Sequence, residues 1–204
     1  DSILIQDFER NPIAPEYHMI SWDPVSAEKG EFRHFMQKEI HEQVRSLSDT
    51  MVGRIDFDDY RIMLPDLHLT ADEAQHIRKI FITACGTAYH AGLVGKILIE
   101  QIAHIPVEVM VASEFRYLDS IIDEGTVVMS ISQSGETADT LAAMEEGGRK
   151  GAKLWSIVNA IGSQAMRVAD GYISMQTGPE IGVASTKAFT APLVDLYMLA
   201  VLLG

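Results

Sequence analysis

The chain has 204 residues, 47% of them hydrophobic, which is enough for one globular domain with a sizeable core plus an extension. Its formal net charge of −13 argues against a nucleic-acid surface, because phosphate backbones attract basic patches. A small anionic ligand is still compatible with this charge, since backbone N–H groups and hydroxyls can bind an anion without cations.

Cysteine content and the chain ends indicate a cytoplasmic piece of a longer protein. Cys85 is the only cysteine in the sequence, which excludes an internal disulfide and a cysteine-based zinc site. The start lacks the pattern of a signal peptide, and the most apolar stretch, 193–203, is too short to span a bilayer. Because the chain starts at Asp1 and stops inside an apolar run, we interpret both ends as cuts.

The first 78 residues divide into a linker and a helical extension. Residues 1–30 contain Pro12, Pro15 and Pro24, which is typical of an extended linker, with a short strand possible at Ser2–Ile5. Within 31–78, Thr70 and Glu73 match a capping box before a short helix. Apolar residues at helical spacing also predict an amphipathic helix, and they are Phe32, Phe35, Met36, Ile40, Val44 and Leu47.

Residues 79–204 alternate short apolar runs with helical segments, which predicts an α/β domain. Alternation of this kind gives a doubly wound, three-layer sandwich with a mainly parallel five-stranded sheet of flavodoxin-like type. Strands are expected at Ile80–Ala84, Val107–Val111, Thr126–Ile131, Leu154–Val158 and Tyr172–Met175. Helices are expected at Ala88–Ala103, Ser113–Leu118, Thr137–Lys150, Ser163–Ala169 and Thr186–Leu203, where Pro192 should kink the last one or delay its start.

The strongest motif is the run Ser132–Thr137, which follows a buried strand and opens a helix. Ligands bind at the carboxyl ends of strands in such sheets, and a helix N-terminus favours an anion. The hydroxyls of Ser132, Ser134 and Thr137 could therefore accompany backbone amides around a phosphate, and Gly135 would let the backbone approach it. The alternative is that these residues only cap the helix and shape the turn.

Two further strand ends carry weaker signals. Gly86 and Thr87 follow the first strand of the sheet, where Thr87 could cap a helix or contact a ligand. In the loop before the last helix, Ser185 or Thr186 would by default cap that helix. Lys187 is mismatched with the positive end of the helix dipole, which indicates an acidic or anionic neighbour.

Motifs of competing functions are missing from the sequence. It contains no G-x-G-x-x-G dinucleotide fingerprint after the first strand, no G-K-[ST] loop and no G-x-S-x-G nucleophile elbow. The seven histidines lack metal-ligand spacing. Few aromatic residues lie near the strand ends, which disfavours a flavodoxin-like electron carrier.

From about Gly30 to the end, the sequence resembles the glutamine–fructose-6-phosphate aminotransferase (isomerising) family, also called glucosamine-6-phosphate synthase. The Ser132–Thr137 run is shared with wider sugar isomerase (SIS) domains, whereas Phe35–Gln43 and Glu180–Thr190 narrow the resemblance to this family. The runs that carry it are Phe35–Gln43, Cys85–Thr87, Ala112–Tyr117, Ser132–Thr140 and Glu180–Thr190.

The resemblance implies a fold, a reaction and a set of partners. The chain would be the linker plus the first SIS domain of a three-part, homodimeric, cytoplasmic transferase of amino-sugar biosynthesis. That enzyme makes glucosamine 6-phosphate from fructose 6-phosphate and glutamine, with no metal or organic cofactor and no nucleic acid or membrane partner. The chain alone should be inactive, because the glutaminase domain and the second SIS domain are missing. A non-enzymatic sugar-phosphate-sensing SIS module is the alternative.

The resemblance also assigns residue roles. Ser132, Gln133, Ser134 and Thr137 would hold the sugar phosphate, while Gly86, Thr87, Val183 and Ser185 would line the sugar. Catalytic residues are expected in the missing second SIS domain, and Glu136, Glu180 and His90 are expected to be structural. Ala88 departs from the serine usual in the family, which puts one ligand hydrogen bond in doubt. We further predict that the main phosphate contacts are hydroxyls and amides, without an essential Lys or Arg.

Overall fold

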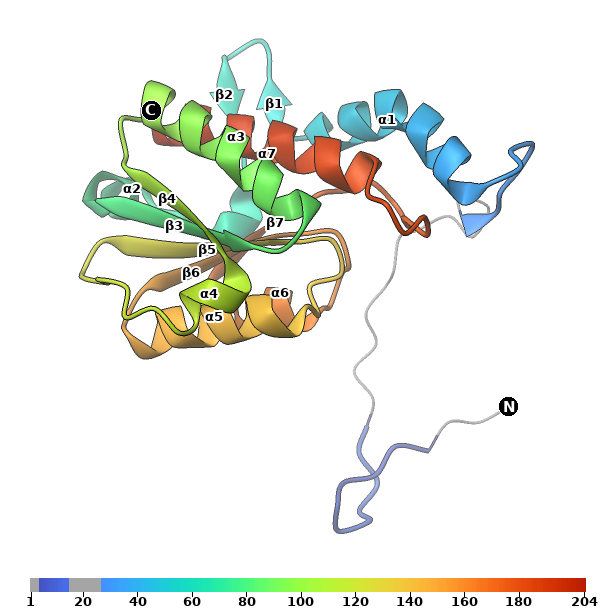
Figure 1. Ribbon diagram of the computed structural model, residues 1–204, viewed down its shortest axis with the longest axis horizontal. Helices are drawn as coiled ribbons and strands as arrows, with labels where there is room; N and C mark the ends of the chain where they lie inside the picture. Colours follow the sequence, from blue (N-terminus) through green and yellow to red (C-terminus); the bar gives the residue numbers. More distant parts are fainter. Residues whose placement is uncertain (1–3, 15–26) are drawn as a thin grey trace.

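The computed structural model describes residues 4–14 and 27–204, with a five-stranded parallel sheet at its centre (Figure 1). The strand order is β4-β3-β5-β6-β7, and every neighbouring pair is parallel, which confirms the predicted doubly wound fold. All residues of β5 are buried, as expected for a central strand covered on both faces. The strands are β3 (Lys79–Ala84), β4 (Val107–Val111), β5 (Thr126–Ser132), β6 (Lys153–Val158) and β7 (Gly171–Ser174).

Helices cover both faces of the sheet. One face carries α3 (Thr87–Ile102) and α7 (Lys187–Leu203), and the other carries α4 (Ala112–Phe115), α5 (Ala138–Arg149) and α6 (Gln164–Val168) (Figure 1). The larger hydrophobic cluster lies between the sheet and the α3–α7 layer, and smaller clusters lie under α4 and α5. Pro192 is inside α7, which begins at Lys187 all the same, so a start delayed by the proline is wrong.

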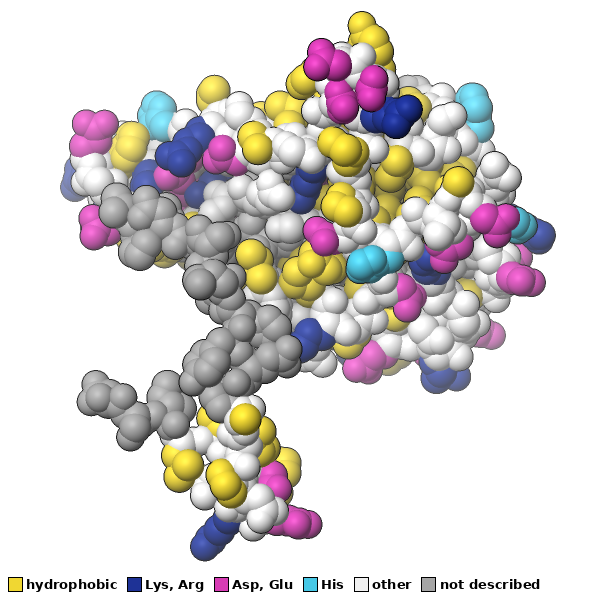
Figure 2. Space-filling view, turned by 180° about the vertical axis from the view of Figure 1, so that it is seen from behind, with side chains coloured by type: hydrophobic (Ala, Val, Ile, Leu, Met, Phe, Trp, Pro, Cys, Tyr) yellow, Lys and Arg dark blue, Asp and Glu magenta, His cyan; other side chains and the backbone are white. Residues whose placement is uncertain are grey.

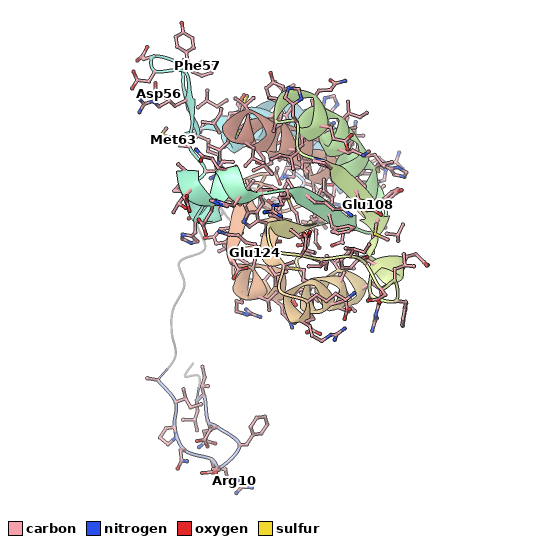
Figure 3. The ribbon with its side chains drawn as sticks, turned by 90° about the vertical axis from the view of Figure 1, so that its left-hand side faces the viewer. Arg10, Asp56, Phe57, Met63, Glu108 and Glu124 are labelled. Carbon is pink, nitrogen blue, oxygen red and sulfur yellow. The ribbon has the colours of Figure 1, made fainter. Side chains whose placement is uncertain are left out.

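The extension consists of α1 (Phe35–Met51), a two-stranded hairpin, the short 3-10 helix η2 (Pro65–Leu67) and α2 (Ala71–His76). The hairpin of β1 (Ile55–Asp56) and β2 (Arg61–Ile62) was not predicted, because its strands are too short to give a periodic pattern. Asp56 and Phe57 lie toward its tip, which projects from the molecule (Figure 3).

The predicted capping box at the start of α2 is confirmed. The Glu73 carboxylate accepts from the Thr70 amide at 2.8 Å, and the Thr70 hydroxyl accepts from the Glu73 amide at 3.2 Å. Lys153 of β6 pairs with the same carboxylate at 2.5 Å. These bonds lower the pKa of Glu73 to about 2, first through Lys153 and then through Thr70. The box therefore also ties α2 to the sheet.

Helix α1 exists as predicted, but its apolar stripe does not face the core. Met36, Ile40 and Val44 are exposed, at 39%, 48% and 80%. The polar residues Glu39, Ser46 and Thr50 form the buried face instead. Periodicity marks which residues share a face but cannot tell which face is buried, and here the polar face meets polar groups of the chain around α7.

The N-terminal segment is only partly described. Residues 2 and 3 of the possible strand Ser2–Ile5 lie outside the described residues, and Leu4 and Ile5 belong to no strand. An isolated antiparallel bridge joins Gln6 to Pro12. Within residues 4–14 and 27–204, no helix is long and apolar enough to cross a membrane.

The sheet reverses its order between β3 and β5. The chain leaves β3 toward β4 at the edge and then returns to β5 on the other side of β3. The carboxyl ends of β3 and β5 therefore flank the point at which connections diverge, which is where open α/β sheets bind ligands.

Candidate functional site

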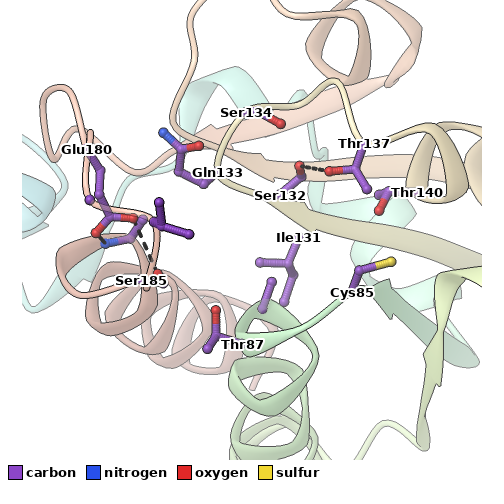
Figure 4. A pocket seen from close by; sticks show the side chains of 14 residues that line it. Cys85, Thr87, Ile131, Ser132, Gln133, Ser134, Thr137, Thr140, Glu180 and Ser185 are labelled. Carbon is purple, nitrogen blue, oxygen red and sulfur yellow. Dashed lines mark hydrogen bonds between the residues drawn. The ribbon is translucent and has the colours of Figure 1, made fainter.

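A pocket of about 220 Å³ opens at the switch between β3 and β5 (Figure 4). Its size suits a compact ligand, since pockets for drug-sized molecules start at about 300 Å³. The turns after β3 and β5 and the loop before α7 all contribute side chains. The lining residues are Cys85, Thr87, Ala88, Ile131, Ser132, Gln133, Ser134, Thr137, Thr140, Glu180, Gly182, Val183, Ser185 and Ala188.

The pocket thus brings together seven of the eight residues that the resemblance assigned to the sugar phosphate, and Gly86 is the exception. Gly86 precedes α3 with φ 60° and ψ −134°, a conformation that residues with a Cβ rarely adopt. Its part is to turn the chain between β3 and α3, and its two neighbours Cys85 and Thr87 line the pocket. The side chain of Cys85 is half-buried there.

The turn after β5 is organised by its own hydroxyls. Ser132 Oγ accepts from the Gly135 amide at 3.0 Å and lies 3.3 Å from Thr137 Oγ1, and Ser134 Oγ accepts from the Glu136 amide at 3.2 Å (Figure 4). Helix α5 starts just after Thr137, which makes no side-chain cap bond. The first amides of a helix have no intrahelical partner, so they remain able to donate to an anion at this end.

Gly135 is required by packing as well as by the turn. Its φ is 65°, and an added Cβ would lie 2.2 Å from Ser163 Oγ and 2.8 Å from a methyl group of Val158. The same segment is pinned to β6, because the Gln133 carbonyl accepts from the amides of Asn159 and Ala160. The glycine therefore lets the turn lie directly against β6 and the start of α6.

The loop before α7 is held by carboxylates and amides rather than by its own hydroxyls. Glu180 Oε1 accepts from the amides of Thr186 and Ala188 and from the Thr186 hydroxyl, at 2.9 to 3.1 Å. Thr186 is the N-cap residue of α7, as expected, but its side chain makes no capping bond. The hydroxyls of Ser185 and Thr186 donate to Glu180 instead, and the carboxylate occupies the helix end. Asn159 fixes the other end of the loop through Thr177 and Gly178.

Two other candidates have structural partners. Glu136 accepts from the Gln164 amide at 2.8 Å and so stabilises the start of α6. His90 lies exposed on α3 with its ring against Tyr89. Neither lines the pocket.

Thr140 is a pocket residue that the sequence analysis did not assign to the site. It is 1% exposed, lines the pocket one turn beyond Thr137, and its hydroxyl makes no hydrogen bond in the structure. A buried hydroxyl without a partner is costly unless something else satisfies it. Its position three residues after Thr137, on the same face of α5, was the signal in the sequence that could have revealed it.

The pocket lining contains one carboxylate and no Lys or Arg. The cation nearest in sequence, Lys187, is 3% exposed and pairs with Glu42 of α1 at 2.8 Å. An acidic neighbour was predicted for this lysine, and Glu42 confirms it. Among residues 4–14 and 27–204, no cluster of His, Cys, Asp and Glu has an arrangement that could hold a metal ion.

The fold and the site define the class of protein. The family model of the SIS domain matches residues 75–202. The chain therefore belongs to the SIS domain family.

Relatives within this class are similar over nearly the whole chain. Glutamine–fructose-6-phosphate aminotransferases (isomerising) of Caldanaerobacter subterraneus subsp. tengcongensis and Symbiobacterium thermophilum are 50% and 48% identical to it. The alignments cover 98% and 100% of the chain but 33% and 34% of the relatives, so the chain spans about a third of their length. The C-terminal domain of glucosamine-fructose-6-phosphate aminotransferase from Francisella tularensis superposes with a TM-score of 0.80 at 39% identity, over 87% of this chain and 49% of that one.

Proposed function

We propose that the pocket binds a sugar phosphate, with the phosphate at the turn after β5. Ser132, Gln133, Ser134 and Thr137 surround the phosphate, together with the free amides at the start of α5. Thr87, Val183 and Ser185 face the sugar. Gly86 turns the chain between β3 and α3 and so brings Thr87 to the pocket. The observation that carries the proposal is that hydroxyl groups from three separate turns converge beside a helix N-terminus.

We further propose that the sugar phosphate is fructose 6-phosphate, or its product glucosamine 6-phosphate, in a glutamine-dependent aminotransferase of amino-sugar biosynthesis. The relatives that carry this name support the choice. In that enzyme the present chain forms the substrate-holding wall, and its parts are a linker (1–30), a helical extension (31–78) and the first SIS domain (79–204). The residues that move protons at the sugar lie in a second SIS domain.

The proposed partners are a glutaminase domain and a second SIS domain of the parent chain, within a cytoplasmic homodimer. Exposed hydrophobic side chains on three helices support contacts of this kind. They include Met36, Ile40 and Val44 on α1, Val94 and Ile97 on α3, and Tyr197 and Val201 on α7. Hydrophobic side chains are visible on the surface below the projecting hairpin (Figure 2). Such apolar surface commonly marks a protein interface.

Calorimetric titration of the chain tests the binding proposal. Fructose 6-phosphate and glucosamine 6-phosphate should bind, and unphosphorylated fructose should bind far more weakly, because it lacks the group that meets α5. Equal affinity for fructose and fructose 6-phosphate would show that the turn after β5 is not a phosphate site. Preference for glucosamine 6-phosphate over fructose 6-phosphate would leave the site intact and change only the preferred ligand.

A further inference from the structure

Helix α1 lies beside α7 and outside the matched SIS segment, yet it holds the loop that lines the pocket (Figure 1). Glu39, on its buried face, is 2% exposed. Its Oε1 accepts from the amides of Ile181 and Gly182 at 2.6 and 3.0 Å, and its Oε2 accepts from the Gly182 amide at 3.1 Å. A carboxylate that accepts backbone N–H bonds makes charge-assisted bonds, which are stronger than neutral ones.

Gly182, whose amide donates to Glu39, has no side chain that would obstruct this contact. A Cβ added to Gly182 would lie 2.4 Å from Glu39 Oε2 and 3.4 Å from Met36 Cα. Only a residue without a side chain lets the loop come this close to α1. Gly182 and its neighbour Val183 are themselves pocket-lining residues. The segment that binds the Glu39 carboxylate is therefore itself part of the pocket wall.

The same face of α1 also contacts the chain before and after residues 181–183. Thr50 donates to the Met175 carbonyl at 2.7 Å, just beyond β7. Glu42 pairs with buried Lys187 at 2.8 Å, where α7 begins. These two contacts fix the ends of the stretch from β7 to α7, and Glu39 is the residue of α1 that binds its middle at Ile181 and Gly182.

We infer that Glu39 is a positioning residue of the sugar subsite: its carboxylate sets the path of residues 181–183 so that Val183 and Ser185 face the ligand. The inference rests on the proposed function, because the ligand it refers to is a sugar phosphate. It adds that the helical extension, which the SIS match does not include, is part of the binding site. The hydrogen bonds of Glu39 go to Ile181 and Gly182 and not to the turn after β5, so the effect should be confined to the sugar.

The test uses Glu39→Leu, the milder Glu39→Gln, and Thr50→Val as matched control. Thr50→Val removes a buried contact of the same helix but leaves the middle of the loop untouched. Affinities for fructose 6-phosphate and for inorganic phosphate are measured by calorimetry. For Glu39→Leu we expect about a tenfold loss for fructose 6-phosphate and none for phosphate. Glu39→Gln, which keeps one accepting oxygen, should lose less, and Thr50→Val should change neither affinity.

Amide hydrogen exchange, measured on the chain without ligand, tests independently of binding whether Glu39 positions residues 181–183. The amides of Ile181 and Gly182 should exchange at least about tenfold faster in Glu39→Leu, relative to a core amide such as that of Met129, and not in Thr50→Val. Unchanged exchange in Glu39→Leu, or an equal loss for phosphate and fructose 6-phosphate, would overturn the positioning role. Failure of the unsubstituted chain to bind any sugar phosphate would instead overturn the proposed function, while the exchange result would still decide whether Glu39 positions the loop.

Discussion

Ser134 provides the most direct residue-scale test of the phosphate turn. Its hydroxyl lines the pocket, and its one hydrogen bond is to the nearby Glu136 amide. A hydrogen bond to a charged group is worth about 1.5–3 kcal/mol, so Ser134→Ala should weaken fructose 6-phosphate binding by about one to two powers of ten. The melting temperature should stay close to that of the unsubstituted chain.

The matched control for Ser134→Ala is Ser48→Ala, at an exposed serine in the last turn of α1. Lys187→Ala is unsuitable as a test of cationic binding, because it removes the buried ion pair that joins α7 to Glu42 of α1. Normal binding by Ser134→Ala would show that the serine does not contact the phosphate, and unfolding of the variant would show that the serine stabilises the fold instead.

Thr140 gives a second residue-scale prediction with an unusual combination of effects. Thr140→Val keeps the shape of the side chain and removes a buried hydroxyl that has no protein partner. Stability should therefore be unchanged or slightly higher, measured by denaturant unfolding. Affinity for fructose 6-phosphate should fall several-fold, because the substitution removes a hydroxyl of the pocket that is free to bond to the ligand or to a water bound with it. A loss of stability without a loss of affinity would place Thr140 in the core only.

Whether the role of a single residue could be predicted from the sequence depends on where the partners of that residue lie in the chain. The position of Ser132, Ser134 and Thr137 at the end of one strand could be predicted, because their neighbours in the sequence are a buried strand and a helix start. The structural role of Glu180 was expected, but its partners Thr186 and Ala188 were not, because a turn that no local pattern marks brings them to it. Glu39 is more distant still, since its hydrogen bonds reach across more than a hundred residues.

At the scale of elements, the bond between α2 and β6 predicts a pH dependence. Ion pairing lowers the folded-state pKa of Glu73 to about 2, below the ordinary value of 4.5. A carboxyl whose pKa is lower in the folded state contributes stability above its unfolded pKa and loses it as the pH falls toward the folded pKa. The stabilisation should therefore be complete above about pH 5 and should decline between 4.5 and 2.

The measurement compares the unsubstituted chain with Glu73→Gln, which keeps an oxygen able to accept from Thr70. The difference in unfolding free energy should be constant near neutral pH and should shrink as acid is added. Because the Glu73 side chain is 44% exposed, the difference should be modest. A difference that grows in acid would contradict the lowered pKa.

Helices and strands were predicted from the sequence more successfully than the partners of single residues. Helix α1 shows the limit of such prediction, because its buried face was not predicted. The five strands of the sheet were all predicted, because continuous apolar runs bounded by turns describe buried strands directly. The helix α1 was predicted with equal ease, yet its orientation was not. Met36, Ile40 and Val44 form an apolar stripe that a single domain would bury, and the structure leaves it exposed. The reason is that Glu39 and Glu42 have partners on α7 and its preceding loop.

For the whole molecule, we predict that the purified chain forms no glucosamine 6-phosphate from glutamine and fructose 6-phosphate. The pocket offers hydroxyls, amides, the thiol of Cys85 and one carboxylate that is already bound to a helix end. Its lining therefore contains no His, no Lys and no free carboxylate that could act as a base at the sugar. The check is a product assay on the chain alone, with a full-length relative as positive control. Product formation above the level without protein would mean that the chain holds catalytic groups of its own.

The absence of Lys and Arg from the pocket lining has a kinetic consequence for this chain. A phosphate dianion must approach a molecule of net charge −13, and the pocket lining has no Lys or Arg to compensate for that repulsion. Added salt screens the repulsion, with a Debye length of about 10 Å at 0.1 M. The association rate of fructose 6-phosphate, measured by stopped flow, should therefore rise as sodium chloride increases from about 10 to 150 mM, opposite to the usual trend for anions steered by basic sites. The chain would thus capture its ligand faster in the salt of a cell than in dilute buffer.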